Sequence, residues 1–323
     1  MTHPREALHA APRLSRRAES LGTENAFVVL AEVNALARAG RDIVSFCIGQ
    51  PDFPTPANVQ EAGIAAIRAG RHGYTPSAGI DELRAAAAAD IGARRGLAIA
   101  PDDVVVGAGA KPFIAYTIAS VTDFGAGEEV IYPVPGFPIF ESLASRPGML
   151  ERTVICDGAS KTWAMTGWRI GYAANRTLAP VFTRWITNTD SCASQISQWA
   201  AVEAISGPQD AADAMRASFL ERRDLIVGLL NGVPGVRCKL PGGAFYAWPN
   251  VTEACRITGC ADSEALRRRL LNDAGVAVLA DIHFGRRVPG DGQHIRFSYA
   301  ASKEAIAEGV RRVDAFVRRH ARP

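Results

Sequence analysis

The feature that most constrains this chain is the polar loop from Asp157 to Arg169, which lies between the apolar runs 153–156 and 170–174. Apolar runs of this length on either side of a tight loop predict a strand, a loop and a second strand. Lys161 stands at the mouth of the loop, and Arg169 follows eight residues later. A lysine amine can form a Schiff base with a carbonyl cofactor, and an arginine can hold a phosphate through two hydrogen bonds. The loop therefore indicates a cofactor site.

A second segment suits phosphate binding. The apolar run 104–106 leads into the small residues Gly109 and Ala110, with Lys111 next, and a helix is predicted from Phe113. Small residues let backbone N–H groups approach an anion, and a helix N-terminus adds partial positive charge. The spacing is not that of a dinucleotide fingerprint. The segment therefore predicts a phosphate turn.

The composition is that of a soluble globular enzyme. The chain has 323 residues, of which 48% are apolar and 21% charged, enough for one large domain or two. A net charge of +3 spread along the chain does not indicate nucleic-acid binding. The densest basic clusters, 267–269 and 318–319, fall in helical patterns and are predicted to be solvated helix faces.

The sequence carries no signal for secretion, a membrane or a metal. The N-terminus is polar, and no stretch approaches the roughly 18 uninterrupted apolar residues of a membrane span. The six cysteines lack the spacing of metal ligands. We therefore expect reduced thiols in a cytoplasmic protein and no metal site.

Two loops in the first quarter of the chain could serve a small-molecule site. Gly49 opens the segment 49–56 after a predicted strand at 43–48, and its three prolines make the backbone rigid and extended. Tyr74 stands in the segment 72–84, before an alanine-rich helix. Either could instead be structural, the first as a connector and the second as a tyrosine packed on its own helix.

Two later positions offer groups for a ring and a carboxylate. Phe137 follows the predicted strand 128–133, and a flat aromatic face suits a flat ring. Arg296 lies in the last predicted strand, 294–300, and a planar guanidinium suits a carboxylate. The alternatives are a phenylalanine that closes the core and an arginine in a surface salt bridge.

Apolar periodicity predicts most of the remaining elements. A hairpin-like turn is predicted around 241–243, and a strand at 276–280. The predicted helices are 25–39, 58–70, 113–121, 195–205, 211–230 and 263–274.

Six of these segments, in this order and over nearly the whole chain, resemble the class I/II aminotransferases, which are fold-type I pyridoxal-phosphate (PLP) enzymes. The most specific is the string Ser-Lys-x3-Met-Thr-Gly-Trp-Arg at 160–169. The resemblance implies transamination between an amino acid and a 2-oxo acid, in amino acid metabolism and biosynthesis. It also implies a role for each matching residue.

In the implied site, Lys161 holds PLP and moves the proton during catalysis. The substrate carboxylate is held by Arg296 with Gly49. The remaining cofactor contacts implied by the resemblance are the phosphate ligands Gly109, Ala110, Lys111 and Arg169, the ring-stacking Phe137, and Tyr74, which reaches the phosphate of the neighbouring subunit.

The implied fold is α/β, of PLP-transferase fold type I. It has a mostly parallel central sheet with helices on both faces, plus a small α+β domain. Residues 50–210 would form the PLP-binding large domain, internally shortened near 143–144. Residues 1–49 and 211–323 would form the small domain. The role of Tyr74 implies a homodimer.

The chain departs from the family pattern between Phe137 and Lys161, which are only 24 positions apart. One βαβ unit takes roughly 30 residues, so at least two such units are absent. The absent part holds an Asn-Pro-x3-Gly turn, which binds the phenolic oxygen of PLP, and the aspartate that pairs with its ring nitrogen. Asn188 and Asp190 lie downstream and match neither pattern.

Three hypotheses follow from this departure. The chain could be an aminotransferase whose activity is impaired by the missing segment. It could be a catalytically dead remnant of the fold that acts as a dimerising or binding protein. It could also be a related PLP lyase, because the shared motifs specify the cofactor and not the reaction.

Overall fold

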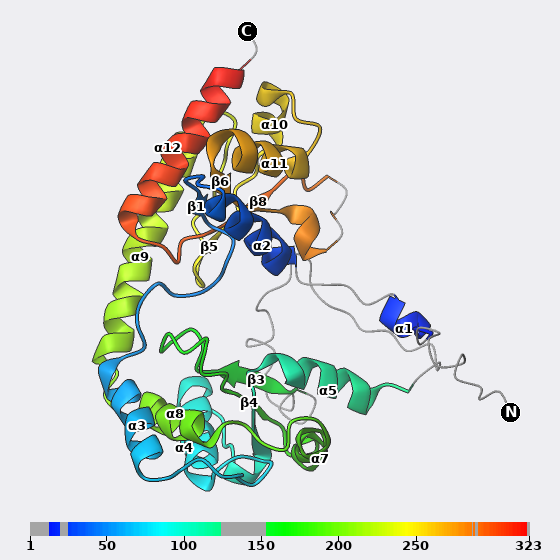
Figure 1. Ribbon diagram of the computed structural model, residues 1–323, viewed down its shortest axis with the longest axis vertical. Helices are drawn as coiled ribbons and strands as arrows, with labels where there is room; N and C mark the ends of the chain where they lie inside the picture. The colour runs from blue at the N-terminus through cyan, green and yellow to red at the C-terminus, as the bar shows by residue number, and fades with distance from the viewer. Residues whose placement is uncertain (1–12, 20–24, 124–152, 286, 288–289, 322–323) are drawn as a thin grey trace, which may run out of the picture.

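The computed structural model describes residues 13–19, 25–123, 153–285, 287 and 290–321. Figure 1 shows most of them in two regions, joined along one side by the long helix α9 (Asp210–Asn231). We call residues 57–206 the central region. Residues 25–48 and 210–320 make the terminal region. The short helix α1 (Arg16–Glu19) stands apart from both.

The central region is built in three layers around a small sheet. Helices α4 and α8 cover one face of the sheet, and α5 and α7 cover the other. The elements of the region are α3 (Ala57–Arg68), α4 (Asp81–Arg95), η1 (Pro101–Asp103), β2 (Val104–Gly107), α5 (Lys111–Val121), β3 (Ile155–Gly158), β4 (Gly171–Ala174), α7 (Ala179–Thr189) and α8 (Gln195–Ser206).

The sheet has the strand order β2-β4-β3. Strand β4 is antiparallel to both neighbours, so β2 and β3 run in the same direction. Successive side chains of a strand point to opposite faces. Val104 and Val106 accordingly pack with α4 and α8, while Val105 packs with α5 and α7. All four residues of β2 are buried, which suits its β-branched sequence. The sheet thus places helices on both of its faces, as expected.

The terminal region packs short strands against long helices. Strand β1 pairs in parallel with β6, and β8 lies between β5 and β7 in antiparallel pairs. Its elements are α2 (Asn25–Arg38), β1 (Val44–Ser45), α9, β5 (Tyr246–Ala247), α10 (Thr252–Thr258), α11 (Ser263–Ala274), β6 (Val276–Ala277), β7 (Leu279–Ala280), η3 (Asp281–Phe284), β8 (Ile295–Ser298) and α12 (Lys303–His320).

Residues from the two ends of the sequence share the core of the terminal region. Val29 and Val33 of α2 pack against Leu271 of α11. Phe46, next to β1, packs with Phe297 of β8 at a ring-centroid distance of 5.5 Å. Helix α12 lies along α9 in Figure 1 and contributes one buried apolar stripe to the same core. The segment after β1 is therefore held between the C-terminal strands.

Two helices were not predicted from the sequence. Helix α7 buries Ala179, Phe182 and Ile186, whose spacings of three and four fit one helical face. Helix α10 is one of the shorter helices and ends at a left-handed Gly259. The hairpin predicted around 241–243 is reduced to a single bridge between Arg237 and Asn250, and β5 pairs with β8 instead.

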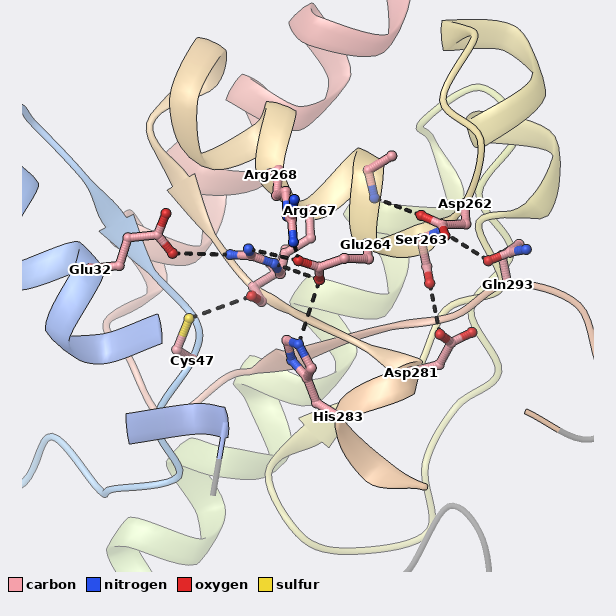
Figure 2. A network of polar contacts seen from close by, with 12 residues as sticks. Glu32, Cys47, Asp262, Ser263, Glu264, Arg267, Arg268, Asp281, His283 and Gln293 are labelled. Carbon is pink, nitrogen blue, oxygen red and sulfur yellow. Dashed lines mark hydrogen bonds and ion pairs between the residues drawn. The ribbon is translucent and has the colours of Figure 1, made fainter. Parts of the chain in front are cut away.

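The prediction of a solvated face at 267–269 was wrong for Arg267. Its side chain is buried and pairs with Glu264 on its own helix (Nε–Oε2, 2.8 Å) and with Glu32 on α2 (Nη1–Oε2, 3.5 Å). Figure 2 shows this group of polar contacts. A buried guanidinium needs carboxylate partners, and the partner on α2 is more than 200 positions away in the sequence.

None of the helices in the described ranges is long and apolar enough to cross a membrane. No group of three or more His, Cys, Asp or Glu side chains that could hold a metal ion occurs in the part of the chain that the structure describes.

Candidate active site

Lys161 stands in a tight loop between β3 and β4, as predicted. The loop is tied to the extended segment after Gly49 through Thr55: Thr55 Oγ1 donates to the carbonyl of Ala164 (2.8 Å) and accepts from Trp168 Nε1 (3.1 Å). Ala164 and Arg169 have positive φ values of 49° and 56°. Non-glycine residues adopt this region rarely, and functional loops are a common place for it.

The Lys161 side chain points from its loop to the segment that follows β1. Its Nζ donates a hydrogen bond to the carbonyl oxygen of Gly49 and lies 5.9 Å from the ring centroid of Phe245. Gly49 has room for no side chain, because a Cβ there would overlap the hydroxyl of Tyr246. The amine therefore contacts the segment that joins the two regions, and it lies near Phe245 of the terminal region.

The predicted phosphate turn and Arg169 lie together. Arg169 Nη2 donates to the carbonyl of Ala108 (3.2 Å), and Nη1 donates to the carbonyl of Thr166 (3.0 Å). Gly109 has φ 96°, and a Cβ there would overlap the Arg169 guanidinium. Ala110 is the N-cap residue of α5, and no side chain caps this helix end. Backbone N–H groups at a helix start next to a guanidinium form a corner that fits a phosphate.

Arg296 on β8 packs against two aromatic rings. Its guanidinium carbon lies 4.4 Å from the ring centroid of Tyr246 and 4.8 Å from that of Phe284. Its Nη2 donates to the carbonyl oxygen of Cys47. Contacts with two rings hold a planar guanidinium in one orientation. Arg296 therefore faces the same segment as Lys161.

Two of the predicted residues lie apart from this group, and a third lies outside the described residues. Lys111, the first residue of α5, has its Nζ 5.7 Å from the ring centroid of Phe27. Tyr74 lies in a loop of the central region and is 88% exposed. The third is Phe137.

Sequence reasoning missed the aromatic residues that line the site. Tyr246 stacks on Arg296 and fills the space next to Gly49, while Phe284 also packs against the guanidinium. The Pro-x-Gly-x-Phe-Tyr string at 241–246 marked Tyr246 as a family position. Its stacking partner lies 50 positions further on, and no local pattern indicates that contact.

The two downstream residues considered as substitutes for the missing segment make other contacts. Asn188 Nδ2 donates to the carbonyl of Arg184 within α7 (2.7 Å). Asp190 accepts from the hydroxyl of Tyr116 on α5 (Oδ2, 3.4 Å). The first contact lies within α7, and the second joins the end of α7 to α5.

The fold brings Lys161 and Arg296 to one short segment and places Arg169 against the turn at Gly109. The family model of the class I and II aminotransferases matches residues 41–149 and 142–313. The chain belongs to this family. It is therefore an enzyme that catalyses PLP-dependent transamination.

Relatives and solved structures agree with this assignment. The chain is 31% identical to the aspartate/prephenate aminotransferase of Cereibacter sphaeroides, covering 87% of this chain and 92% of that protein. It is 28% identical to the aspartate aminotransferase of Bacillus sp. strain YM-2, covering 94% and 99%. The aspartate aminotransferase structure from Rhizobium meliloti superposes with a TM-score of 0.85 at 26% identity, covering 96% of this chain and 100% of that one.

The comparisons are consistent with an internal deletion. The alignment with the Bacillus enzyme runs over 395 residues, more than the 323 of this chain. The relative therefore has residues with no counterpart here. The two stretches matched by the family model meet at 142–149, where the sequence pattern places the gap.

Proposed function

We propose that this chain binds PLP through Lys161 and transfers an amino group between an α-amino acid and a 2-oxo acid. One observation supports the proposal above the others. Lys161 Nζ and Arg296 Nη2 donate to the carbonyl oxygens of Gly49 and Cys47, which are two residues apart. A covalent anchor for the cofactor and a carboxylate-binding group thus meet at one short segment.

Different residues bind the cofactor phosphate, the substrate carboxylate and the cofactor ring. The turn at Gly109, Ala110 and Lys111 holds the cofactor phosphate together with Arg169, whose guanidinium already lies against that turn. Arg296 and the backbone at Gly49 hold the substrate carboxylate. The stacked rings keep the guanidinium in one orientation toward that carboxylate. Phe137 covers the cofactor ring.

Lys161 moves the proton. When bound, PLP supplies the electron sink that makes the substrate Cα acidic. The neutral Lys161 amine takes the proton from Cα and later returns it, as a general base and then a general acid. The chain has no counterpart of the family's ring-nitrogen aspartate in its sequence pattern, so we expect slow turnover.

We further propose the division into a large domain, 50–210, and a small domain, 1–49 with 211–323, and a homodimer. The shared core of α2, β1 and the C-terminal helices supports the first. The exposure of Tyr74 supports the second, since 88% of its side chain is available to a neighbouring subunit. In the dimer, Tyr74 reaches the phosphate bound by its partner.

The test is spectroscopic and then catalytic. Purified protein titrated with PLP should develop a visible absorbance band that Lys161→Ala abolishes and Lys303→Ala leaves unchanged. Lys303 is the matched control because it pairs with Glu221 on the exposed surface. Aspartate, the donor in the names of several relatives, and 2-oxoglutarate are the first substrate pair to try. A folded protein without the band would contradict the proposal.

The product pattern separates the remaining hypotheses. A transaminase forms a new 2-oxo acid only when an acceptor is present, whereas a lyase releases product from the amino acid alone. A catalytically dead protein does neither. No observation in the structure or the comparisons favours the second or third hypothesis.

A further inference from the structure

The segment Asp281–Gly285 lies beside the carboxylate-binding arginine and is anchored to α11 at two points. Asp281 Oδ1 accepts from the hydroxyl of Ser263 (2.7 Å), the first residue of α11. His283 Nε2 lies 3.5 Å from Glu264 Oε2, on the next residue. Phe284 follows directly and stacks on the Arg296 guanidinium at 4.8 Å. The position of η3 therefore determines one wall of the Arg296 site.

The anchor at Glu264 is shared among several cations, as Figure 2 shows. Arg267 and Arg268 each donate to Glu264 from their Nε atoms (2.8 Å). These hydrogen bonds outweigh the burial that opposes ionisation and keep the pKa of Glu264 below its usual value. Glu264 is therefore an ionised carboxylate with His283 as its third neighbour.

The imidazole of His283 has one nitrogen against an acceptor and one without a partner. An ionised carboxylate only accepts hydrogen bonds, so the Nε2 that faces Glu264 carries the proton of the neutral ring. Nδ1 is buried and has no hydrogen-bond partner among the described residues. A second proton must therefore be added at Nδ1, where no group in the described part of the chain accepts its hydrogen bond.

Charged groups of both signs surround this ring. Glu264 and Arg267 face it from α11, Asp281 lies on its own segment, and Arg296 faces it from β8. Burial is the main cause that lowers the pKa of His283, and the two arginines add to it against the two carboxylates.

Three further groups lie beyond these four. Glu32 pairs with Arg267, and Arg287 pairs with Asp281 (Nη2–Oδ1, 2.9 Å). Cys47, whose carbonyl binds Arg296, is a neutral thiol because burial raises its pKa to about 12. Among the groups named here, His283 is the histidine, the residue type whose charge ordinarily changes between about pH 5 and pH 8.

We propose that His283 is a positioning residue for Arg296, and that its protonation strengthens the binding of the substrate carboxylate. The proposal rests on the proposed function, because it assumes that Arg296 binds the substrate. It is carried by the contact of Phe284 with Arg296 (4.8 Å) and by the contact of the preceding residue, His283, with Glu264 (3.5 Å).

Two physical effects act in the same direction. A protonated His283 adds a positive charge beside Arg296, which attracts an anion. It also turns the 3.5 Å contact with the ionised Glu264 into an ion pair, which fixes η3 and the ring of Phe284. The coupling is reciprocal, so a bound carboxylate must raise the pKa of His283.

The experiment measures maleate binding to the PLP-loaded protein by calorimetry between about pH 5 and pH 7.5, a range in which histidine titrates. Wild type is compared with His283→Gln, which stays neutral throughout. At each pH the dissociation constant of His283→Gln is divided by that of wild type. This ratio cancels the titration of maleate itself. His72→Gln is the matched control, because His72 lies in an exposed loop of the central region.

The ratio should be near one at the upper pH. At the lower pH it should rise to about threefold to tenfold, because wild type then has a partly screened positive charge near the bound anion that the variant lacks. The ratio for His72→Gln should stay near one. A constant ratio for His283→Gln would overturn the proposal. A protein that shows no PLP band, or a PLP-loaded protein that binds no maleate, would instead contradict the proposed function.

A second measurement needs no variant. The imidazole of His283 is titrated by NMR in the PLP-loaded wild-type protein, with and without saturating maleate. Its pKa should rise when maleate is bound, while that of His72 should not move. A purely structural His283, whose ring only fills space between Glu264 and Phe284, would show the same pKa in both states and would end the proposal.

Discussion

At the level of single residues, Gly109 is the position where the phosphate turn can carry no side chain. Its φ of 96° is strained for other residues, and a Cβ would overlap the Arg169 guanidinium. We expect Gly109→Ala to weaken PLP binding by roughly tenfold or more, because left-handed backbone costs about 1–2 kcal/mol for a non-glycine residue and Arg169 must also move. The PLP absorbance titration measures this.

Gly73→Ala is the matched control for that change. Gly73 lies in an exposed loop, and an added Cβ there meets nothing within 4 Å. PLP affinity should therefore be unchanged in Gly73→Ala. If both variants bound PLP like wild type, the phosphate would have to lie elsewhere.

At the same scale, Asp281 ties η3 to its surroundings through its charge. Burial opposes its ionisation, but hydrogen bonds from Arg287, Ser263 and the backbone N–H of His294 outweigh burial and lower its pKa below 3.8. A carboxyl with a lowered folded-state pKa stabilises the protein above its unfolded pKa, and that contribution is lost as the pH falls through the folded-state value. The stabilisation is therefore present at neutral pH.

Asp281→Asn should consequently lower the free energy of unfolding by roughly 2–4 kcal/mol near pH 7, since it leaves a charged partner poorly matched. The difference from wild type should shrink at low pH, as the wild-type carboxyl is protonated below the usual range of an aspartate. Urea unfolding at the two pH values measures both quantities. A difference that is independent of pH would show that charge is not the cause.

At the level of elements, α9 holds the segment that carries Gly49. Arg222 of α9 forms a two-armed ion pair with Asp52 (Nη1–Oδ1, 2.6 Å; Nη2–Oδ2, 3.1 Å) and stacks at 4.6 Å on Phe53. The Arg222 side chain is 9% exposed and that of Asp52 is 33% exposed. This pair connects the long helix to the loop that Lys161 contacts.

Asp52→Ala should lower the free energy of unfolding by about 2 kcal/mol. This is less than the loss of one partner of a fully buried pair, because Asp52 is partly solvated. Asp213→Ala, which breaks the exposed pair with Arg216, should change it by less than about 1 kcal/mol. Chemical unfolding of both variants gives the comparison, and equal effects would refute a special role for the Asp52 pair.

Local patterns predicted the elements better than their contacts. Helix α11 spans Ser263–Ala274 as predicted, because Asp262 caps its start and a left-handed Gly275 caps its end. Arg267 lies on the same helix, and its burial could not be predicted because it depends on Glu32 of α2. The spacing of Phe182 and Ile186 could have indicated α7, but this apolar pattern is short and follows a turn.

The candidate site depended on long-range contacts in the same way. The family string at 160–169 identified Lys161 and Arg169, and the turn at 109–111 matched its pattern. That Lys161 and Arg296 both reach the segment 47–49 follows only from the packing of Phe46, the residue after β1, between β6 and β8. Tyr246 and Phe284 were not predicted because stacking on Arg296 leaves no local signal.

At the level of the whole molecule, the proposed dimer makes each site depend on two chains. Lys161→Ala and Tyr74→Ala dimers should each lose most activity. When the two proteins are mixed and allowed to exchange subunits, a hybrid dimer contains one site with both native residues. Activity should therefore recover to roughly one quarter of wild type. Sedimentation shows whether dimers form, and a monomer or an absence of recovery would refute a shared site.

The most direct test of the proposed site is chemical trapping of the cofactor. PLP-loaded protein is reduced with borohydride, which makes the link between lysine and cofactor permanent, and its peptides are mapped by mass spectrometry. The chain has four lysines, at positions 111, 161, 239 and 303, so the assignment is unambiguous. A pyridoxyl group on Lys161 alone is the expected result. A label on another lysine, or no label in folded protein, would contradict the assignment of Lys161 as the cofactor lysine.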